Sequence, residues 1–172
     1  IEFKEVDYQK SFKKISKEFR IILGQPIILF VGSGFKRKGA EEFLRIIAML
    51  KTNGVKAFVV GKESNMSYYQ NLSKKLNIDN RIFFTGPRVD VNDFYTISDV
   101  FLFPTHYDPF SNVVLEAMYF ENAVFTTRSN GASEILDPEF IMNRPYKKVA
   151  ASIDNLINNS ASLNKVKIRN KK

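Results

Sequence analysis

The chain has 172 residues, enough for one domain with its own core, and its 44% hydrophobic and 13% aromatic residues argue against disorder. It has no cysteine and a single histidine, which excludes disulfides and thiolate catalysis and disfavours a zinc site or a histidine-based triad. Lysine and arginine (26) outnumber aspartate and glutamate (18), and the net charge of +8 favours anionic partners.

Runs rich in Val, Ile and Phe alternate with segments of helical periodicity, which is the pattern of a parallel α/β sheet. The apolar runs are nearly continuous, as expected where helices cover both faces of the sheet. We expect strands at 27–31, 55–60, 82–85, 100–103 and 124–127, and a weaker one near 140–142.

Apolar residues at helical spacing predict a helix between each pair of strands. We expect helices over 40–50, 69–76, 91–97, 113–118 and 146–157. Asp90 and Ser111 are predicted N-caps, and Asn122 is a predicted left-handed helix stop.

The order of these elements predicts a doubly wound, Rossmann-like parallel sheet of about six strands. Residues 1–25 are expected to form an interdomain connection and first helix, 26–160 the binding domain, and 161–172 a basic C-terminal tail. Because the first residue is isoleucine, we expect the chain to be part of a longer protein. Ligands of such sheets bind at the carboxyl ends of the strands, so the loops that follow the strands are the candidate functional segments.

The first of these loops runs from Gly32 through Gly34 to Gly39 and contains Arg37 and Lys38. Small residues let a backbone approach a ligand closely, and a helix N-terminus favours an anion. The spacing is neither G-x-G-x-x-G nor a Walker motif. The loop is either a phosphate site or a tight turn with solvated cations. We favour phosphate, because two cations oppose the helix dipole unless an anion is bound.

Two further loops carry weaker signals. Residues 61–64 (Gly-Lys-Glu-Ser) are equally compatible with a close backbone approach and with an ordinary turn. Residues 85–90, which include Arg88 and Val89, taken alone indicate a turn before a helix capped by Asp90, and in a nucleotide site they would present backbone groups to the edge of the base.

The strongest signal is the segment 108–118, in which Asp108 and Glu116 stand eight positions apart. The helix that begins near Ser111, Asn112 and Val113 can receive a diphosphate on its first amides. Glu116, about one turn into that helix, can accept hydrogen bonds from the two ribose hydroxyls, and Asp108 can face the sugar beyond the phosphates.

This segment resembles the E-x7-E signature of glycosyltransferase family 4, commonly E-P-F-G-x-x-x-x-E-A-M. The resemblance extends in order and spacing over residues 26–136, and it includes 32–39, 85–86, 99–104 and 130–134. It implies the C-terminal, nucleotide-sugar-binding half of a retaining GT-B enzyme. The form of the first loop is similar to that of lipopolysaccharide-core hexosyltransferases.

Carried over by position, the resemblance implies that Arg37 and Lys38 neutralise the diphosphate of the donor, Glu116 holds the ribose and Asp108 contacts the sugar. It implies no metal and no cofactor, because cationic side chains replace a divalent ion. The donor is expected to be a UDP-sugar, and the acceptor a glycan or lipid-linked glycan of surface polysaccharide or lipopolysaccharide.

Three positions depart from the family pattern. Asp108 is one methylene shorter than glutamate, Ser111 replaces a common glycine, and Glu121-Asn122 replaces a Cys-Gly-like pair. The family's acceptor site and catalytic histidine belong to an N-terminal domain, which we expect as a further partner. His106 does not match that histidine and is interpreted as a loop residue.

Two other functions remain as alternatives. A GT-B epimerase or hydrolase acting on UDP-N-acetylhexosamine would have a similar donor half. A nucleic-acid-binding module is suggested by charge alone, and no basic–aromatic face supports it. We expect a cytoplasmic location, possibly at the inner face of the membrane, with any peripheral contact made chiefly by the N-terminal domain.

Overall fold

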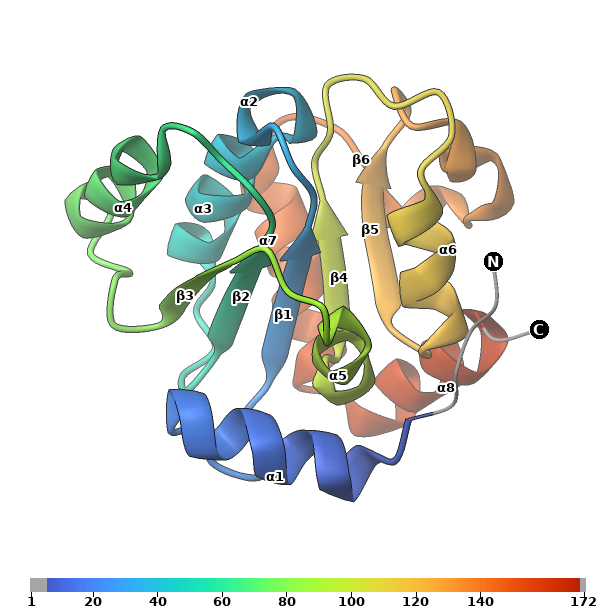
Figure 1. Ribbon diagram of the computed structural model, residues 1–172. Coiled ribbons are helices and arrows are strands. Elements are labelled where there is room, and N and C mark those ends of the chain that lie inside the picture. Colours follow the sequence, from blue (N-terminus) through green and yellow to red (C-terminus); the bar gives the residue numbers. More distant parts are fainter. Residues whose placement is uncertain (1–5, 171–172) are drawn as a thin grey trace.

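A computed structural model describes residues 6–170 of the chain. Six strands form one fully parallel sheet in the order β3-β2-β1-β4-β5-β6 (Figure 1). The strands are β1 (Ile27–Val31), β2 (Lys56–Val60), β3 (Ile82–Gly86), β4 (Val100–Phe103), β5 (Ala123–Thr127) and β6 (Ile141–Met142). This order is that of a Rossmann fold, so the prediction of a doubly wound sheet is confirmed.

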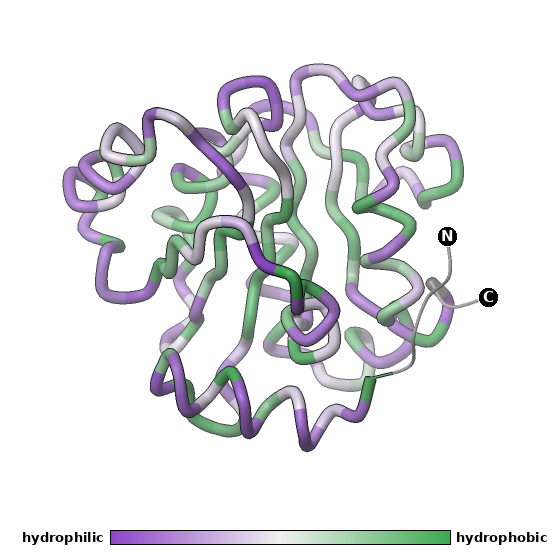
Figure 2. The backbone as a smooth tube through the Cα atoms, in the orientation of Figure 1, coloured by the Kyte–Doolittle hydropathy of each residue, from purple (hydrophilic) through white to green (hydrophobic). Residues whose placement is uncertain are grey.

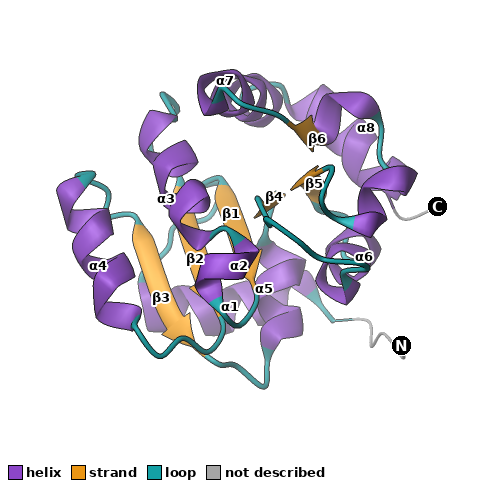
Figure 3. Cartoon of the chain, turned by 90° about the horizontal axis from the view of Figure 1, so that it is seen from above, coloured by secondary structure: helices purple, strands orange, loops and turns teal. Residues whose placement is uncertain are grey.

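Helices lie on both faces of the sheet, with α3 and α7 on one side and α5 and α6 on the other (Figures 1 and 3). Helix α1 packs on α5 and crosses the amino edge of the sheet, at the bottom of Figure 1. The helices are α1 (Tyr8–Phe19), α2 (Phe35–Lys38), α3 (Ala40–Met49), α4 (Met66–Lys75), α5 (Val91–Ile97), α6 (Asn112–Tyr119), α7 (Tyr146–Ile157) and α8 (Ser160–Asn170). Two short 3-10 turns, Gly131–Ile135 and Pro138–Phe140, flank the loop that leads to β6.

Apolar residues of the central strands form the core, the green centre of Figure 2, and aromatic rings link the strands to the helices that cover them. Phe30 of β1 contacts Phe43 of α3 (5.5 Å between ring centroids) and Phe103 of β4 (5.7 Å). Elsewhere, Phe58 of β2 contacts Phe94 of α5 (5.2 Å). Because helices cover both faces, every residue of a central strand can be apolar, which explains the continuous runs in the sequence.

The expected tail at 161–172 is wrong for its described part, because Ser160–Asn170 is the helix α8. The helix packs against α7 and β5, and Leu163 and Val166 contact the core. Lys167 pairs with Asp99, and Arg169 pairs with Asp137. The many basic residues of this segment suggest a solvated tail, but Leu163 and Val166 between them are enough to hold the helix on the core.

The predicted stop of α6 at Asn122 is also wrong. The left-handed residue is Glu121 (φ 59°), and the amides of Glu121 and Asn122 close the helix on the carbonyls of Met118 and Ala117. Asn122 is fully buried, and its side-chain amide donates to the carbonyl oxygens of Tyr95 (2.9 Å) and Phe120 (3.0 Å). It serves to join α5 to α6.

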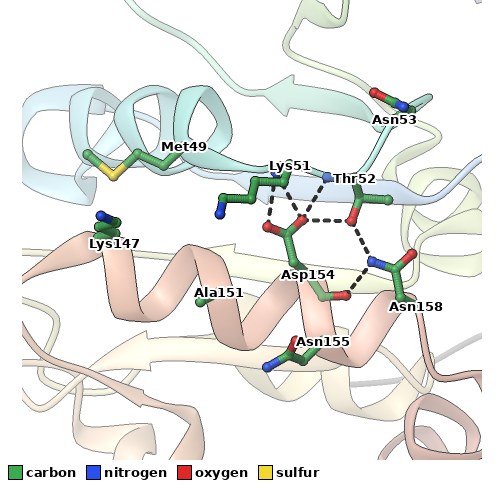
Figure 4. A pocket seen from close by; sticks show the side chains of 9 residues that line it. All are labelled: Met49, Lys51, Thr52, Asn53, Lys147, Ala151, Asp154, Asn155 and Asn158. Atoms are coloured by element: carbon green, nitrogen blue, oxygen red, sulfur yellow. Dashed lines mark hydrogen bonds between the residues drawn. The ribbon is translucent and has the colours of Figure 1, made fainter.

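A cavity of about 880 Å³ lies at the amino edge, between α7 and the loop after α3 (Figure 4). Asp154 of α7 points into that loop and accepts from the backbone N–H of Lys51 (3.0 Å) and Thr52 (3.0 Å) and from the Thr52 hydroxyl (2.7 Å). Ligands of parallel sheets bind at the opposite edge, so we interpret these bonds as structural despite the size of the cavity.

We expect Asp154→Ala to lower the free energy of unfolding by about 2–3 kcal/mol at pH 7, because the amides of Lys51 and Thr52 and the Thr52 hydroxyl all lose their acceptor. Burial raises the pKa of this carboxyl, but the bonds from Lys51 and Thr52 outweigh burial and lower it below the ordinary value. A lowered folded-state pKa stabilises above the unfolded value of about 3.9, and this contribution is lost as pH falls through the folded value. Urea unfolding should therefore show the difference shrinking below pH 4. Exposed Asp79→Ala is the control and should change little at either pH.

Candidate functional site

The winding of the chain reverses between β1 and β4, which are neighbours in the sheet although β2 and β3 lie between them in the sequence. The loops after these two strands therefore lie side by side at the carboxyl edge, the top of Figure 1. We call the connection after β1 the first loop and the connection after β4, residues 104–111, the fourth loop. Arg37 and Lys38 belong to the first and Asp108 to the fourth. Doubly wound sheets bind ligands at this point of reversal.

Glycines allow the first loop to pack directly on its neighbours. A Cβ on Gly39 would stand 1.9 Å from the carbonyl oxygen of Pro104, at the start of the fourth loop. A Cβ on Gly61 would stand 1.9 Å from the carbonyl oxygen of Gly32. The Gly32 amide donates to Val60 (2.9 Å) and that of Gly34 to Lys62 (3.2 Å). The loops are held as one rigid layer.

Arg37 and Lys38 lie in α2, a single turn that the sequence did not predict, rather than in an open loop. Its first residue, Phe35, is fully buried, and its amide donates to the carboxylate of Glu63 (2.8 Å). That bond and those from Asn65 and Ser64 lower the pKa of Glu63, with the bond from Asn65 the largest contribution. The buried Phe35 ring anchors α2 and so fixes the orientation of Arg37 and Lys38.

Lys38 forms an ion pair with Asp108, which joins the two loops across the point of reversal. Asp108 is 6% exposed and the Lys38 side chain 14%, and the ammonium also lies 5.3 Å from the centroid of Phe103. A buried carboxylate needs such a partner. The residue predicted to contact the phosphate, Lys38, and the one predicted to contact the sugar, Asp108, therefore hold each other in position.

Arg37 is exposed and is aimed by the fourth loop, since its guanidinium donates to the carbonyl oxygen of Tyr107 (2.9 Å). Gly34, Lys36, Arg37, Glu63 and His106 line a hollow of about 560 Å³ beside it. His106 Nε2 lies 3.2 Å from Glu42 Oε1. His106 is therefore a loop residue bound to α3, as expected.

The start of α6 offers donors that the chain does not use. Ser111 occupies the N-cap position but makes no capping bond, and its hydroxyl is buried without a partner among the described residues. The Val114 amide bonds to the carbonyl of Ser111, whereas those of Asn112 and Val113 have no acceptor within residues 6–170. The N-cap position was predicted correctly; its expected side-chain bond is absent.

Glu116, one turn further along α6, accepts a hydrogen bond from the Tyr95 hydroxyl (3.0 Å). Tyr95 is fully buried in α5, and its ring stacks on Phe120 at 5.7 Å. Burial first, and then the charge and hydrogen bond of Glu116, hold the pKa of Tyr95 well above its usual value. The hydroxyl therefore remains a donor at neutral pH and fixes one oxygen of Glu116.

In the loop after β3, the Arg88 guanidinium is already engaged. It donates to Glu18 of α1 (2.8 Å) and to Asp90 (2.8 Å), and it lies 5.2 Å from the Phe94 ring. Asp90 makes no capping bond, contrary to the prediction, because its carboxylate binds Arg88 and Lys14 instead. Hydrogen bonds from Arg88, the largest influence, keep the pKa of Asp90 far below its ordinary value. The side chain of Val89 is fully exposed.

Sequence reasoning missed the residues that support the carboxylates. The apolar spacing of residues 91–97 predicts a helix and gives the Tyr95 hydroxyl no role. Asn130 pairs with Asp108 in an isolated parallel bridge, and Gly131 donates its amide to the Asp108 carbonyl (2.9 Å). In the sequence, the pair Asn130-Gly131 indicates only a turn. The fold shows that this turn contacts Asp108.

The part of the chain that the structure describes has neither a metal-binding cluster nor a membrane-spanning helix. Among residues 6–170, no group of three or more His, Asp or Glu side chains is arranged to hold a metal ion. Within the same residues, no helix has both the length and the apolar composition needed to cross a bilayer.

We expect Gly39→Ala to destabilise the fold by roughly 3 kcal/mol, because the new methyl group collides with the Pro104 carbonyl. Gly54→Ala is a matched control, since φ is +77° at Gly39 and +76° at Gly54, and a Cβ at Gly54 meets nothing within 4 Å. The control should cost only about 1 kcal/mol, the penalty of a left-handed alanine. Equal unfolding midpoints in urea for the two variants would contradict the close approach.

Two proteins of surface-polysaccharide synthesis are similar in sequence. The capsular polysaccharide biosynthesis glycosyltransferase CapM of Staphylococcus aureus is 28% identical over 162 residues, which cover 90% of this chain and 43% of CapM. The lipopolysaccharide glucosyltransferase WaaG of Escherichia coli is 30% identical over 106 residues, which cover 60% of this chain and 28% of WaaG. The chain thus spans less than half the length of either relative.

The fold is that of the C-terminal half of GT-B glycosyltransferases. The crystal structure of WaaG superposes with a TM-score of 0.83 at 22% identity, over 94% of this chain and 45% of that one. Anabaena HepE, solved in complex with UDP and glucose, gives a TM-score of 0.85 at 17% identity, over 98% of this chain and 50% of that one. The model of the family "Glycosyl transferases group 1" matches residues 11–172, and the chain belongs to this family.

Proposed function

We propose that this chain is the donor-binding half of a retaining glycosyltransferase, and that it binds a UDP-sugar at the carboxyl edge of the sheet. The observation that carries the proposal is the unused set of donors at the start of α6: the buried Ser111 hydroxyl and the amides of Asn112 and Val113. A buried hydroxyl without a partner is costly, and a bound diphosphate would supply acceptors to it and to the two amides.

The two cations of α2 complete this phosphate site. Arg37 is exposed and held by Tyr107, and Lys38 is held by Asp108, so neither must be reoriented when the donor binds. As the bond between the anomeric carbon and the diphosphate breaks, its electron pair passes to the diphosphate oxygen. Preorganised cations and amides stabilise that charge. This is the role that a divalent ion has in metal-dependent enzymes, and we propose that no metal is needed.

Glu116 and Asp108 position the two ends of the donor. Tyr95 occupies one oxygen of Glu116, which leaves the other for the ribose hydroxyls. Lys38 occupies one oxygen of Asp108, and the other has no partner among the described residues and is available to a hydroxyl of the sugar. Both carboxylates act by orientation rather than by proton transfer.

The base is bound by backbone groups near Val89, because the Arg88 side chain is committed to Glu18 and Asp90. UDP in the complex of HepE supports uracil as the base. The names of CapM and WaaG support an acceptor that belongs to a surface polysaccharide or lipopolysaccharide. In the whole enzyme, the acceptor hydroxyl passes its proton to the departing diphosphate oxygen and bonds to the anomeric carbon with retention, and an N-terminal domain supplies the acceptor site.

Calorimetric titration with UDP, GDP and ADP, with and without Mg²⁺, tests the donor site. We expect UDP to bind independently of the metal, and Glu116→Gln to weaken binding at least tenfold (about 1.4 kcal/mol) because the ribose loses its charged acceptor. Exposed Glu139→Gln is the control for the same chemical change elsewhere. Unchanged affinity in Glu116→Gln, or a folded chain that binds no nucleotide, would refute the proposal.

Tyr95→Phe tests how Glu116 is held. The substitution keeps the ring on Phe120 and removes only the hydroxyl, so we expect about fivefold weaker UDP binding, the equivalent of one hydrogen bond near 1 kcal/mol. In the background of Glu116→Gln, the same substitution should have a much smaller effect on affinity. Additive losses in the double variant would show that Tyr95 acts on the nucleotide by another route.

A further inference from the structure

Helix α1 has one face in the core and one in solvent. Ser11 and Ile15 are buried, and Phe12 and Phe19 pack partly against the core. The Phe19 ring contacts Phe58 at 5.1 Å, which anchors the helix on the amino edge of the sheet. The packing of these residues on the core fixes which residues of α1 face solvent.

That outward face is a stripe of four cations. Lys10, Lys13 and Lys17 follow one another at intervals of three and four residues, which places them on one side of α1, and Arg20 follows directly as the C-cap of the helix. All four are exposed, and none forms an ion pair with a residue between 6 and 170. Lys14, on the flank of α1, differs because it pairs with Asp90 and Asp93.

An apolar turn follows the stripe directly. Ile22 is 68% and Leu23 is 66% exposed, the largest exposures among aliphatic side chains of this edge. The turn is not loose: the Ile22 amide donates to the Gln25 side chain (2.7 Å), and the Gln25 amide donates to the Ile22 carbonyl (3.1 Å). Two aliphatic side chains are thus presented to solvent by a hydrogen-bonded turn at the end of the cationic stripe.

We propose that this surface, the stripe on α1 together with Ile22 and Leu23, docks on a bilayer that contains anionic lipid. Cations beside a few exposed aliphatic side chains are the combination that an anionic interface binds, with the cations at the headgroups and the aliphatic groups at the acyl boundary. A nucleic acid or an acidic protein surface would match the charges but would leave both aliphatic side chains in water.

The docking surface is separate from the donor site. It lies at the amino edge of the sheet, whereas the loops that carry Arg37, Lys38 and Asp108 lie at the carboxyl edge, at opposite ends of Figure 1. A lipid surface held at α1 leaves the donor edge open to nucleotide and to the other half of the enzyme. The inference does not depend on which nucleotide is bound.

Vesicle flotation with the chain tests the proposal, with vesicles of phosphatidylcholine alone and of phosphatidylcholine mixed with phosphatidylglycerol. We expect binding to the mixed vesicles only, weakening as salt is added. Each cation at such a surface contributes about fivefold, so Lys13→Glu with Lys17→Glu should lower the partition coefficient at least tenfold. Ile22→Ser with Leu23→Ser leaves the charge unchanged and should lower it about threefold or more.

Lys147→Glu with Lys148→Glu is the matched control, because it reverses the same charge at exposed positions at the start of α7, away from α1. Circular dichroism and UDP titration verify that each variant is folded. The proposal is overturned if the chain does not bind the mixed vesicles, or if the control weakens binding as much as the stripe variant. It is also overturned if the serine variant binds vesicles unchanged, or if duplex DNA competes fully, since either result would indicate a site for polyanions in general.

Discussion

The ion pair between Lys38 and Asp108 is the interaction on which the site depends. It connects the loops after β1 and β4 where the winding of the sheet reverses, and it is possible only because Gly39 lets the backbone of one loop touch Pro104 of the other. The Asp108 backbone is held from the far side by Ser129 and Gly131. A cation and a carboxylate that are both nearly buried are thereby kept in place before any ligand arrives, which reduces the ordering that donor binding requires.

The second carboxylate is held by a different device. Glu116 meets the hydroxyl of a fully buried tyrosine from α5, and Asn122 ties the end of α6 to the carbonyl of the same residue, Tyr95. The two carboxylates of the motif therefore differ in environment, one beside an ammonium and the other beside a phenol. Each keeps one oxygen for the protein and leaves one for a ligand, which suits residues that position a substrate.

The two edges of the sheet differ in how far their polar groups are satisfied within the domain. The carboxyl edge carries unused donors and exposed cations, at some cost to stability that a ligand would offset. At the amino edge, Asp154 accepts hydrogen bonds from Lys51 and Thr52 in the loop after α3. Helix α1 covers the core at the same edge through the contact of Phe19 with Phe58. A cavity of about 880 Å³ lies at this edge, among side chains that hydrogen-bond to one another. Cavity volume alone would point to this edge, whereas the buried hydroxyl without a partner among residues 6–170, that of Ser111, lies at the opposite one.

The sequence by itself determined the fold class, the six strands and the segment that carries Asp108 and Glu116, because apolar periodicity and the spacing of a short motif are local properties of a chain. It could not determine that α8 packs on the core, that Arg88 and Asp90 are used by each other and by α1, or that Tyr95 supports Glu116. Each of these depends on a partner distant in sequence: 21 residues separate Tyr95 from Glu116, and 70 separate Arg88 from Glu18. Only the folded sheet, by placing those segments side by side, decided which polar groups were already satisfied and which remained for a ligand.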